Sequence, residues 1–130
     1  MSKVFFISSR LTRKRSLTDK LEDLLEESGL EFIKTNDLVG IKLSFGEAGN
    51  VNFIRPPLVR RVVDRVKARG GKPFLTDSNT LYHGCRTNSV DHLILAEEHG
   101  FGLAQTGAPV IMADGLRSGS WTEVAGGLKH

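Results

Sequence analysis

The stretch that decides the fold is KPFLTDSNTLYHGCRTNS, residues 72–89. It begins as a short apolar run, which is typical of a buried strand. It ends with Asn88 and Ser89, two residue types that favour the start of a helix. A strand that leads through a polar loop into a helix predicts a β–loop–α unit, with the loop at the carboxyl end of the strand.

Strand and helix patterns alternate on both sides of this stretch. Apolar runs predict strands over residues 3–9, 37–45, 72–77 and 108–114. Helical periodicity with capping residues predicts helices over residues 16–29, 56–69 and 90–99. The last eleven residues, SWTEVAGGLKH, predict a β-hairpin that turns at Gly126–Gly127. The alternation predicts an α/β fold: a mostly parallel sheet with helices on both faces, plus this C-terminal β-hairpin.

Length and composition restrict the class of protein. A chain of 130 residues predicts a single α/β domain over residues 1–130. The net charge is only +3, and no aromatic residues interleave with the basic ones, which argues against a nucleic-acid partner. The single cysteine, Cys85, cannot form an internal disulfide, so we expect a reducing, cytoplasmic location. No apolar run has the length of a membrane span, so no membrane partner is expected.

Polar side chains follow the predicted strands at the points where they end. The carboxyl ends of parallel strands meet at one edge of a sheet, where ligands bind. We therefore predict that this edge binds a small anionic molecule. The candidate ligand-binding residues are Lys42, Glu47, Asn50, Asp77, Asn79, Tyr82, Arg86 and Asn88. In this set Lys42 and Arg86 supply positive charge, the asparagines supply hydrogen bonds, and a carboxylate acts as base or metal ligand.

Each candidate also has a purely structural interpretation. Asp77 and Asn79 belong to the residue types that end strands by bonding nearby backbone groups. Lys42 lies inside a strand expected to be covered on both faces, where a lysine must pair, reach solvent or meet an anion. His83 has no neighbouring carboxylate at a spacing typical of metal ligands, so no metal site is predicted. We expect Cys85 to be a partly buried, inert thiol, and we assign no catalytic residue.

The motifs FGEAGN (45–50), KPFLTDSNTLY (72–82) and RTNSVDHL (86–93) carry a family resemblance. From about residue 37 to residue 116 the chain resembles the domain-of-unknown-function 362 family. Members are generally longer, and many carry a ferredoxin-like segment whose cysteines hold two 4Fe–4S clusters. The resemblance implies that this chain is the N-terminal portion of a longer family domain. An incomplete domain exposes sheet edges, which predicts self-association.

Two departures from the family pattern affect the expected chemistry. Ser44 stands where relatives often have histidine, and Cys85 where they often have serine. The first weakens any histidine-dependent mechanism, and the second argues against Cys85 as a nucleophile. The cofactor is left open, because Cys85 alone cannot hold an iron–sulfur cluster.

Two functions remain open at this point. The first is an iron–sulfur-associated protein whose sheet edge binds a small anionic ligand or cofactor. The second is a non-catalytic α/β interaction or structural module that associates with itself. A loop satisfied by internal hydrogen bonds, with Lys42 in solvent, would favour the second.

Overall fold

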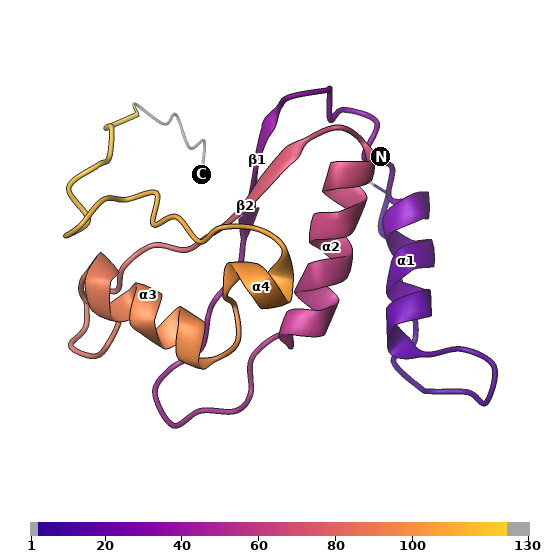
Figure 1. Cartoon of the computed structure of the whole chain (residues 1–130), viewed down its shortest axis with the longest axis horizontal. Coiled ribbons are helices and arrows are strands. Elements are labelled where there is room, and N and C mark those ends of the chain that lie inside the picture. Colours follow the sequence, from indigo (N-terminus) through magenta and orange to yellow (C-terminus); the bar gives the residue numbers. More distant parts are fainter. Residues whose placement is uncertain (1–2, 125–130) are drawn as a thin grey trace, which may run out of the picture.

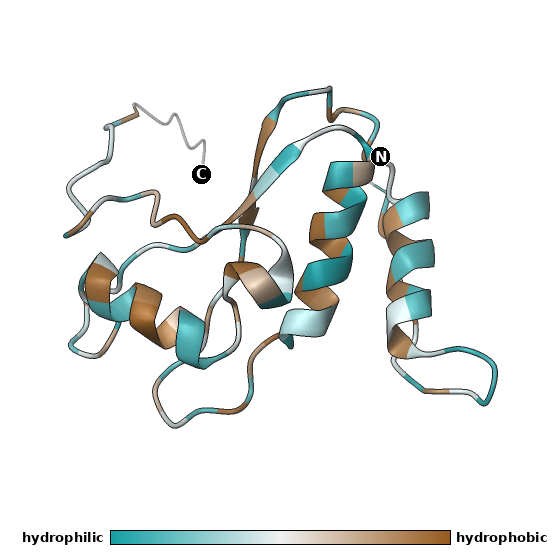
Figure 2. Cartoon of the chain, in the orientation of Figure 1, coloured by the Kyte–Doolittle hydropathy of each residue, from teal (hydrophilic) through white to brown (hydrophobic). Residues whose placement is uncertain are grey.

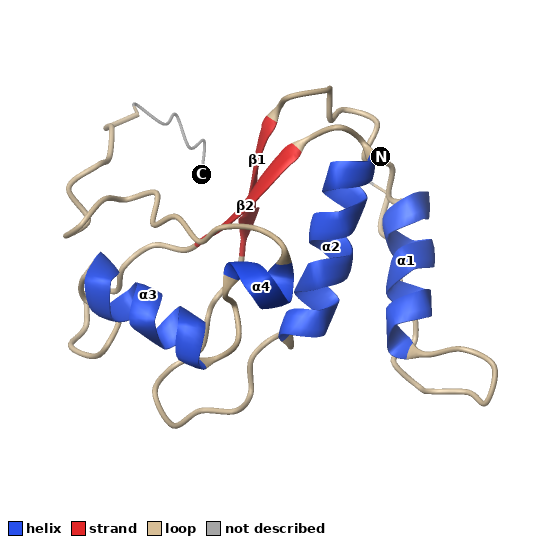
Figure 3. Cartoon of the chain, viewed as in Figure 1, coloured by secondary structure: helices blue, strands red, loops and turns tan. Residues whose placement is uncertain are grey.

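The computed structural model describes residues 3–124 and shows helices arranged around a small parallel sheet (Figure 1). In chain order the elements are α1 (Leu17–Glu27), β1 (Leu38–Lys42), α2 (Pro56–Ala68), β2 (Lys72–Thr76), α3 (Ser89–Glu98) and α4 (Leu103–Thr106). Figure 3 shows the long loops that connect them, including those that follow β1 and β2. The predicted α/β class is confirmed, and the three long helices and the two central strands lie where the patterns placed them.

The two strands pair in parallel, with α2 as the crossover between them. The register pairs Leu38 with Lys72 at one end and Lys42 with Thr76 at the other. On the far side of β2, Leu75 forms a single parallel bridge with Val110. The bridge places the segment around Val110 beside β2, so that β2 lies between it and β1.

The strand predicted over residues 3–9 is absent from the structure. Val4 and Phe6 are almost fully exposed, and the backbone of this segment pairs with no strand among residues 3–124. The Lys20 ammonium instead donates a hydrogen bond to the Ser8 carbonyl at 3.0 Å. The prediction was wrong because β-propensity describes how a side chain suits a sheet surface, and it cannot supply a pairing partner.

The other differences also concern strands. The strand predicted over residues 108–114 is reduced to the bridge at Val110; Pro109, which lacks an N–H, limits the ladder there. Residues 120–124 are not a strand, and the predicted hairpin turn at Gly126–Gly127 lies outside the described residues. Helices on both faces of the sheet are not confirmed, because Leu38, Gly40 and Lys42 leave one face of β1 exposed.

The predicted caps explain where the helices begin. The Ser16 hydroxyl accepts from the Asp19 backbone N–H at 3.1 Å, and the Asp19 carboxylate accepts from the Ser16 N–H at 2.8 Å. These two bonds form a capping box, and the Ser16 backbone N–H, followed by the Ser16 hydroxyl, lowers the pKa of the Asp19 carboxyl below its usual value. Figure 2 shows that apolar and polar residues alternate along α1 and α2. On α2 the apolar stripe buries Val59, Val63 and Val66.

The arginines of α2 pair with acidic side chains of α1. Arg61 lies 2.9 Å from Glu22, and Arg65 lies 3.3 Å from Glu26. The two helices lie side by side in Figure 1, so these pairs connect their exposed flanks. This pairing gives the basic face of α2 a structural role. Within residues 3–124, no helix combines the length and the apolar character needed to cross a bilayer.

Candidate functional site

The carboxyl ends of β1 and β2 bring together two of the predicted site residues. Lys42 is the last residue of β1, and Asp77 directly follows β2. The Lys42 ammonium lies 3.0 Å from Asp77 Oδ1, which also accepts from the Ser78 N–H at 2.9 Å. The Asp77 side chain is 5% exposed, whereas that of Lys42 is 67% exposed. The pair therefore joins a buried carboxylate to an ammonium that remains open to solvent.

The structure corrects one premise about Lys42. The predicted alternation is present, with Leu43 and Phe45 buried and Lys42 and Ser44 exposed. The expectation that both faces of this strand are covered is wrong, because the face that carries Lys42 is exposed. The exposed face therefore explains how a lysine is accommodated at position 42 without a bound ligand. The ion pair between Lys42 and Asp77 is instead the observation that supports a site here.

Arg86 connects the loop after β2 with the segment after β1. Its Nη2 donates to Glu47 Oε1 and, at 2.5 Å, to Tyr82 Oη. Its Nη1 donates to Ser44 Oγ at 3.3 Å and to Asp77 Oδ2 at 3.4 Å. The Arg86 side chain is only 10% exposed, so two carboxylates balance its charge in place of solvent. Arg86 is thus a positioning residue that holds the two polar loops together.

The same contacts set the protonation of Glu47 and Tyr82. Hydrogen bonds from Arg86 and then from Tyr82 hold the pKa of the Glu47 carboxyl below its usual value. The pKa of the Tyr82 phenol is raised, first because Tyr82 donates to the Glu47 carboxylate at 2.5 Å and then because it is desolvated. Near neutral pH Glu47 is ionised and Tyr82 is protonated. A carboxylate of lowered pKa is a weak base, so Glu47 suits charge pairing better than proton abstraction.

Asn79 has a structural role in this loop. Its Nδ2 donates to Ser89 Oγ at 3.1 Å, to Asp114 Oδ1 at 3.3 Å and to the Gly115 carbonyl at 3.0 Å. Its backbone N–H donates to Asp114 Oδ2 at 2.8 Å. Because Asn79 is buried and its amide is occupied in this way, it anchors the loop to the segment around Asp114.

The two remaining asparagines also make local bonds. Asn88 is the N-cap of α3, and its Oδ1 accepts from the N–H groups of Val90 at 3.0 Å and Asp91 at 3.1 Å. Asn50 is exposed, and its Oδ1 accepts from the Asn52 N–H at 2.7 Å. The structure therefore brings together Lys42, Glu47, Asp77, Tyr82 and Arg86, while the three asparagines serve loops and a helix terminus.

Sequence reasoning missed His92, which is fully buried beneath this cluster. Its Nδ1 lies 3.3 Å from Asn79 Oδ1, and its Nε2 lies 3.7 Å from Asp77 Oδ2 without a hydrogen-bond partner. Its ring meets Phe45 edge-on, with centroids 5.7 Å apart. Burial lowers the pKa of the His92 imidazole, although the charge of Asp77 opposes this shift. The helical spacing of His92 from Ser89 was the signal that could have found it.

A small cavity opens beside the Lys42–Asp77 pair. It measures about 250 Å³, and its lining residues are Lys42, Thr76, Asp77, Ser78, Ala113, Asp114 and Ser120. These residues come from the carboxyl ends of β1 and β2 and from the segment that follows the Val110 bridge. The lining includes an ammonium, three hydroxyls and two carboxylates, so it can offer a small polar molecule both donors and acceptors.

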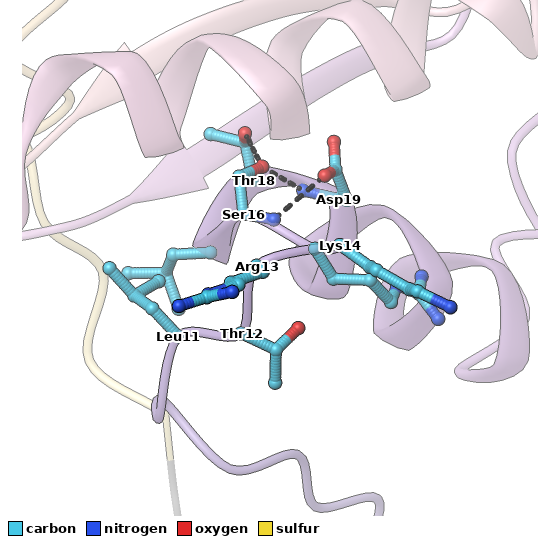
Figure 4. Close-up of a pocket in the computed structure, with 9 residues that line it drawn as sticks. Leu11, Thr12, Arg13, Lys14, Ser16, Thr18 and Asp19 are labelled. Atoms are coloured by element: carbon cyan, nitrogen blue, oxygen red, sulfur yellow. Dashed lines mark hydrogen bonds between the residues drawn. The ribbon is translucent and has the colours of Figure 1, made fainter.

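A larger cavity of about 630 Å³ lies elsewhere, at the start of α1 (Figure 4). It is lined by consecutive residues from Leu11 to Asp19, and Figure 4 shows the capping bonds of Ser16 and Asp19 within it. Those bonds already occupy polar groups at the helix terminus, and the surrounding side chains are exposed or half-exposed. We therefore place the candidate site at the carboxyl edge of the sheet.

Metal and cluster chemistry finds little support in the donor set. Among residues 3–124, no three histidine, cysteine, aspartate or glutamate side chains are grouped so as to hold a metal ion. Cys85 is exposed, which corrects the expectation of a partly buried thiol. A 4Fe–4S cluster is held by four cysteine thiolates, so this chain's single cysteine does not fit such a group.

The fold and the edge residues define an α/β protein with a polar cluster at the carboxyl ends of parallel strands. A family model described as "Domain of unknown function (DUF362)" matches residues 39–130, and the chain belongs to this family. The predicted resemblance is thereby confirmed. No curated protein and no solved structure matches the chain.

Proposed function

We propose that the carboxyl edge of the sheet binds a small anionic molecule in the cavity beside Lys42 and Asp77. The carrying observation is the exposed Lys42 ammonium at the rim of a polar cavity of about 250 Å³. Arg86 is held by Glu47 and Asp77, so its role is to position the carboxylates. The charge that attracts an anion therefore comes from Lys42.

The cavity also favours a ligand with hydrogen-bonding groups. Thr76, Ser78 and Ser120 supply hydroxyls, and the Asp114 carboxylate lies on the same lining. A small anion that carries a donor of its own would satisfy both the ammonium and the carboxylates. A cavity of about 250 Å³ is smaller than most small-molecule sites, which favours a ligand of few atoms.

The test is native mass spectrometry with elemental analysis of protein purified without chelator. The variants are Lys42→Met and a matched control, Lys72→Met, which removes an exposed lysine at the opposite end of the strand pair. We expect a small molecule bound to the wild type and to Lys72→Met but not to Lys42→Met. Titration with inorganic phosphate and with oxalate, followed by amide chemical shifts, provides known probes. A wild-type protein that carries no small molecule and responds to neither probe would refute the proposal.

A second candidate function is a non-catalytic module that associates with itself. It is favoured by Asn79 and Asn88, whose polar groups are occupied by internal hydrogen bonds. It is also favoured by the exposed outer side of β1. The iron–sulfur association implied by the resemblance stays a prediction; its cysteines would have to come from outside residues 1–130, and the elemental analysis would detect the iron.

A further inference from the structure

The outer edge of β1 is an unpaired strand edge. The bonds from Lys72 N–H to the Asp37 carbonyl (2.7 Å) and from Leu43 N–H to the Thr76 carbonyl (3.1 Å) bracket the ladder with β2. Because the backbone groups of alternate residues in a parallel strand bond to the same neighbour, the residues between Asp37 and Leu43 divide into two sets.

The first set, Val39 and Ile41, faces β2. The N–H and C=O groups of the second set, Leu38, Gly40 and Lys42, point away from β2. None of these outward groups has a hydrogen-bond partner within residues 3–124.

This edge lacks most of the features that prevent strands from pairing with other chains. Natural edge strands carry prolines, bulges or several charges. The sequence of β1, LVGIK, has no proline, and its register with β2 runs without a bulge. Leu38 is 78% exposed at one end, and Gly40 leaves the centre free of a side chain. Lys42, at the other end, is the single charged residue of the strand.

We infer that the outer edge of β1 pairs antiparallel with β1 of a second copy of the chain, about a twofold axis at Gly40. A self-complementary edge makes an isologous contact of this kind. Leu38 then lies opposite the partner's Lys42, and Gly40 lies opposite the partner's Gly40. The result is a continuous four-stranded sheet.

This register is selected by side chains as well as by backbone groups. It pairs all five residues of β1, and it keeps the two Lys42 ammonium groups at opposite ends of the ladder. The aliphatic stem of the partner's Lys42 covers the exposed Leu38 side chain. A register that set Lys42 against the partner's Lys42 would oppose like charges and pair fewer residues.

The inference rests on the second candidate function and is independent of ligand binding at Lys42. It is tested with two variants at one exposed position, Leu38→Glu and Leu38→Lys. Glutamate at position 38 would face the partner's Lys42 with opposite charge, and lysine would face it with like charge. Two such pairs form in each dimer, so we expect the dissociation constant from analytical ultracentrifugation to be about tenfold higher for Leu38→Lys than for Leu38→Glu.

Amide hydrogen exchange measured at low and high protein concentration locates the contact. We expect concentration to slow exchange at Leu38, Gly40 and Lys42, while Val39 and Ile41 are slow at every concentration. A dimer with equal dissociation constants for the two variants, or with fast exchange at Leu38, Gly40 and Lys42, would overturn the edge pairing but retain self-association. A protein that is monomeric up to about 1 mM would overturn both, because this concentration detects even weak pairing.

Discussion

Replacement of His92 by glutamine tests how the buried cluster responds to pH. Asn79 donates through its Nδ2 to three acceptors, so its Oδ1 is left to accept from His92 Nδ1. His92 Nδ1 therefore carries a proton, and burial, which lowers the pKa of the imidazole, disfavours a second proton on Nε2, the nitrogen that lies near Asp77 Oδ2. Glutamine at this position can still donate to Asn79 but cannot take up a proton.

The sign of the effect follows from the lowered pKa of His92. In the unfolded chain the imidazole gains a proton as the pH falls through about 6.5, whereas the folded protein resists this protonation. The unfolded state binds more protons between these two pKa values. The free energy of unfolding therefore falls with decreasing pH, by up to about 1.4 kcal/mol per pH unit inside that window.

The dependence of the free energy of unfolding on pH is measured by urea unfolding, followed by circular dichroism, from about pH 7.5 to about pH 5. This pH range lies above the usual pKa values of carboxyl groups, so their titration contributes little. At pH 7.5 we expect the His92→Gln variant to be less stable by about 1 kcal/mol, because the ring contact with Phe45 is lost. As the pH falls, the wild type should lose stability faster, and the two curves should converge. Curves that stay parallel would refute the buried, neutral imidazole.

Three further predictions, two of them with a matched control variant, test the fold. We expect Leu75→Ala, in the fully buried centre of β2, to lower the free energy of unfolding by about 2–5 kcal/mol in urea; a loss under about 1 kcal/mol would contradict the assigned core. Asn88→Ala removes the cap of α3 and should cost about 1 kcal/mol, whereas Asn50→Ala, in an exposed loop, should cost less than about 0.5 kcal/mol; equal losses would contradict the cap. Gly71→Ala places a methyl group 2.9 Å from two core side chains and should lower the melting temperature, while Gly84→Ala meets no atom within 4 Å and should not.

The parts of the fold that could be predicted are those in which local chemistry and burial agree. The capping box of Ser16, the cap at Asn88 and the buried run around Leu75 are all marked by neighbouring residues. The strand predicted over residues 3–9 had the right composition, but pairing depends on where distant backbone lies. The four-residue helix α4 is too short to show a period.

The candidate site could also be predicted only in part from the sequence. The rule that ligand loops follow parallel strands placed Asp77, Lys42 and Arg86 at one edge, and the structure brings them together. The sequence could not show that the polar groups of Asn79 are hydrogen-bonded within the protein, because its partner Asp114 lies 35 residues away in the chain. Nothing local distinguishes an asparagine that binds a ligand from one that binds another loop.

The two cationic side chains at this edge, Arg86 and Lys42, have different roles. Arg86 presents a planar fork of donors, which suits simultaneous bonds to the carboxylates of Glu47 and Asp77. Lys42 presents a compact charge on a flexible stem, and its side chain remains 67% exposed while it touches Asp77. An arriving anion can therefore recruit the Lys42 ammonium without breaking the buried network. Recruiting Arg86 would leave two carboxylates without their partner, which is costly at a buried site. We therefore expect the anion binding proposed for this edge to depend on Lys42, while Arg86 preserves the geometry that Lys42 requires.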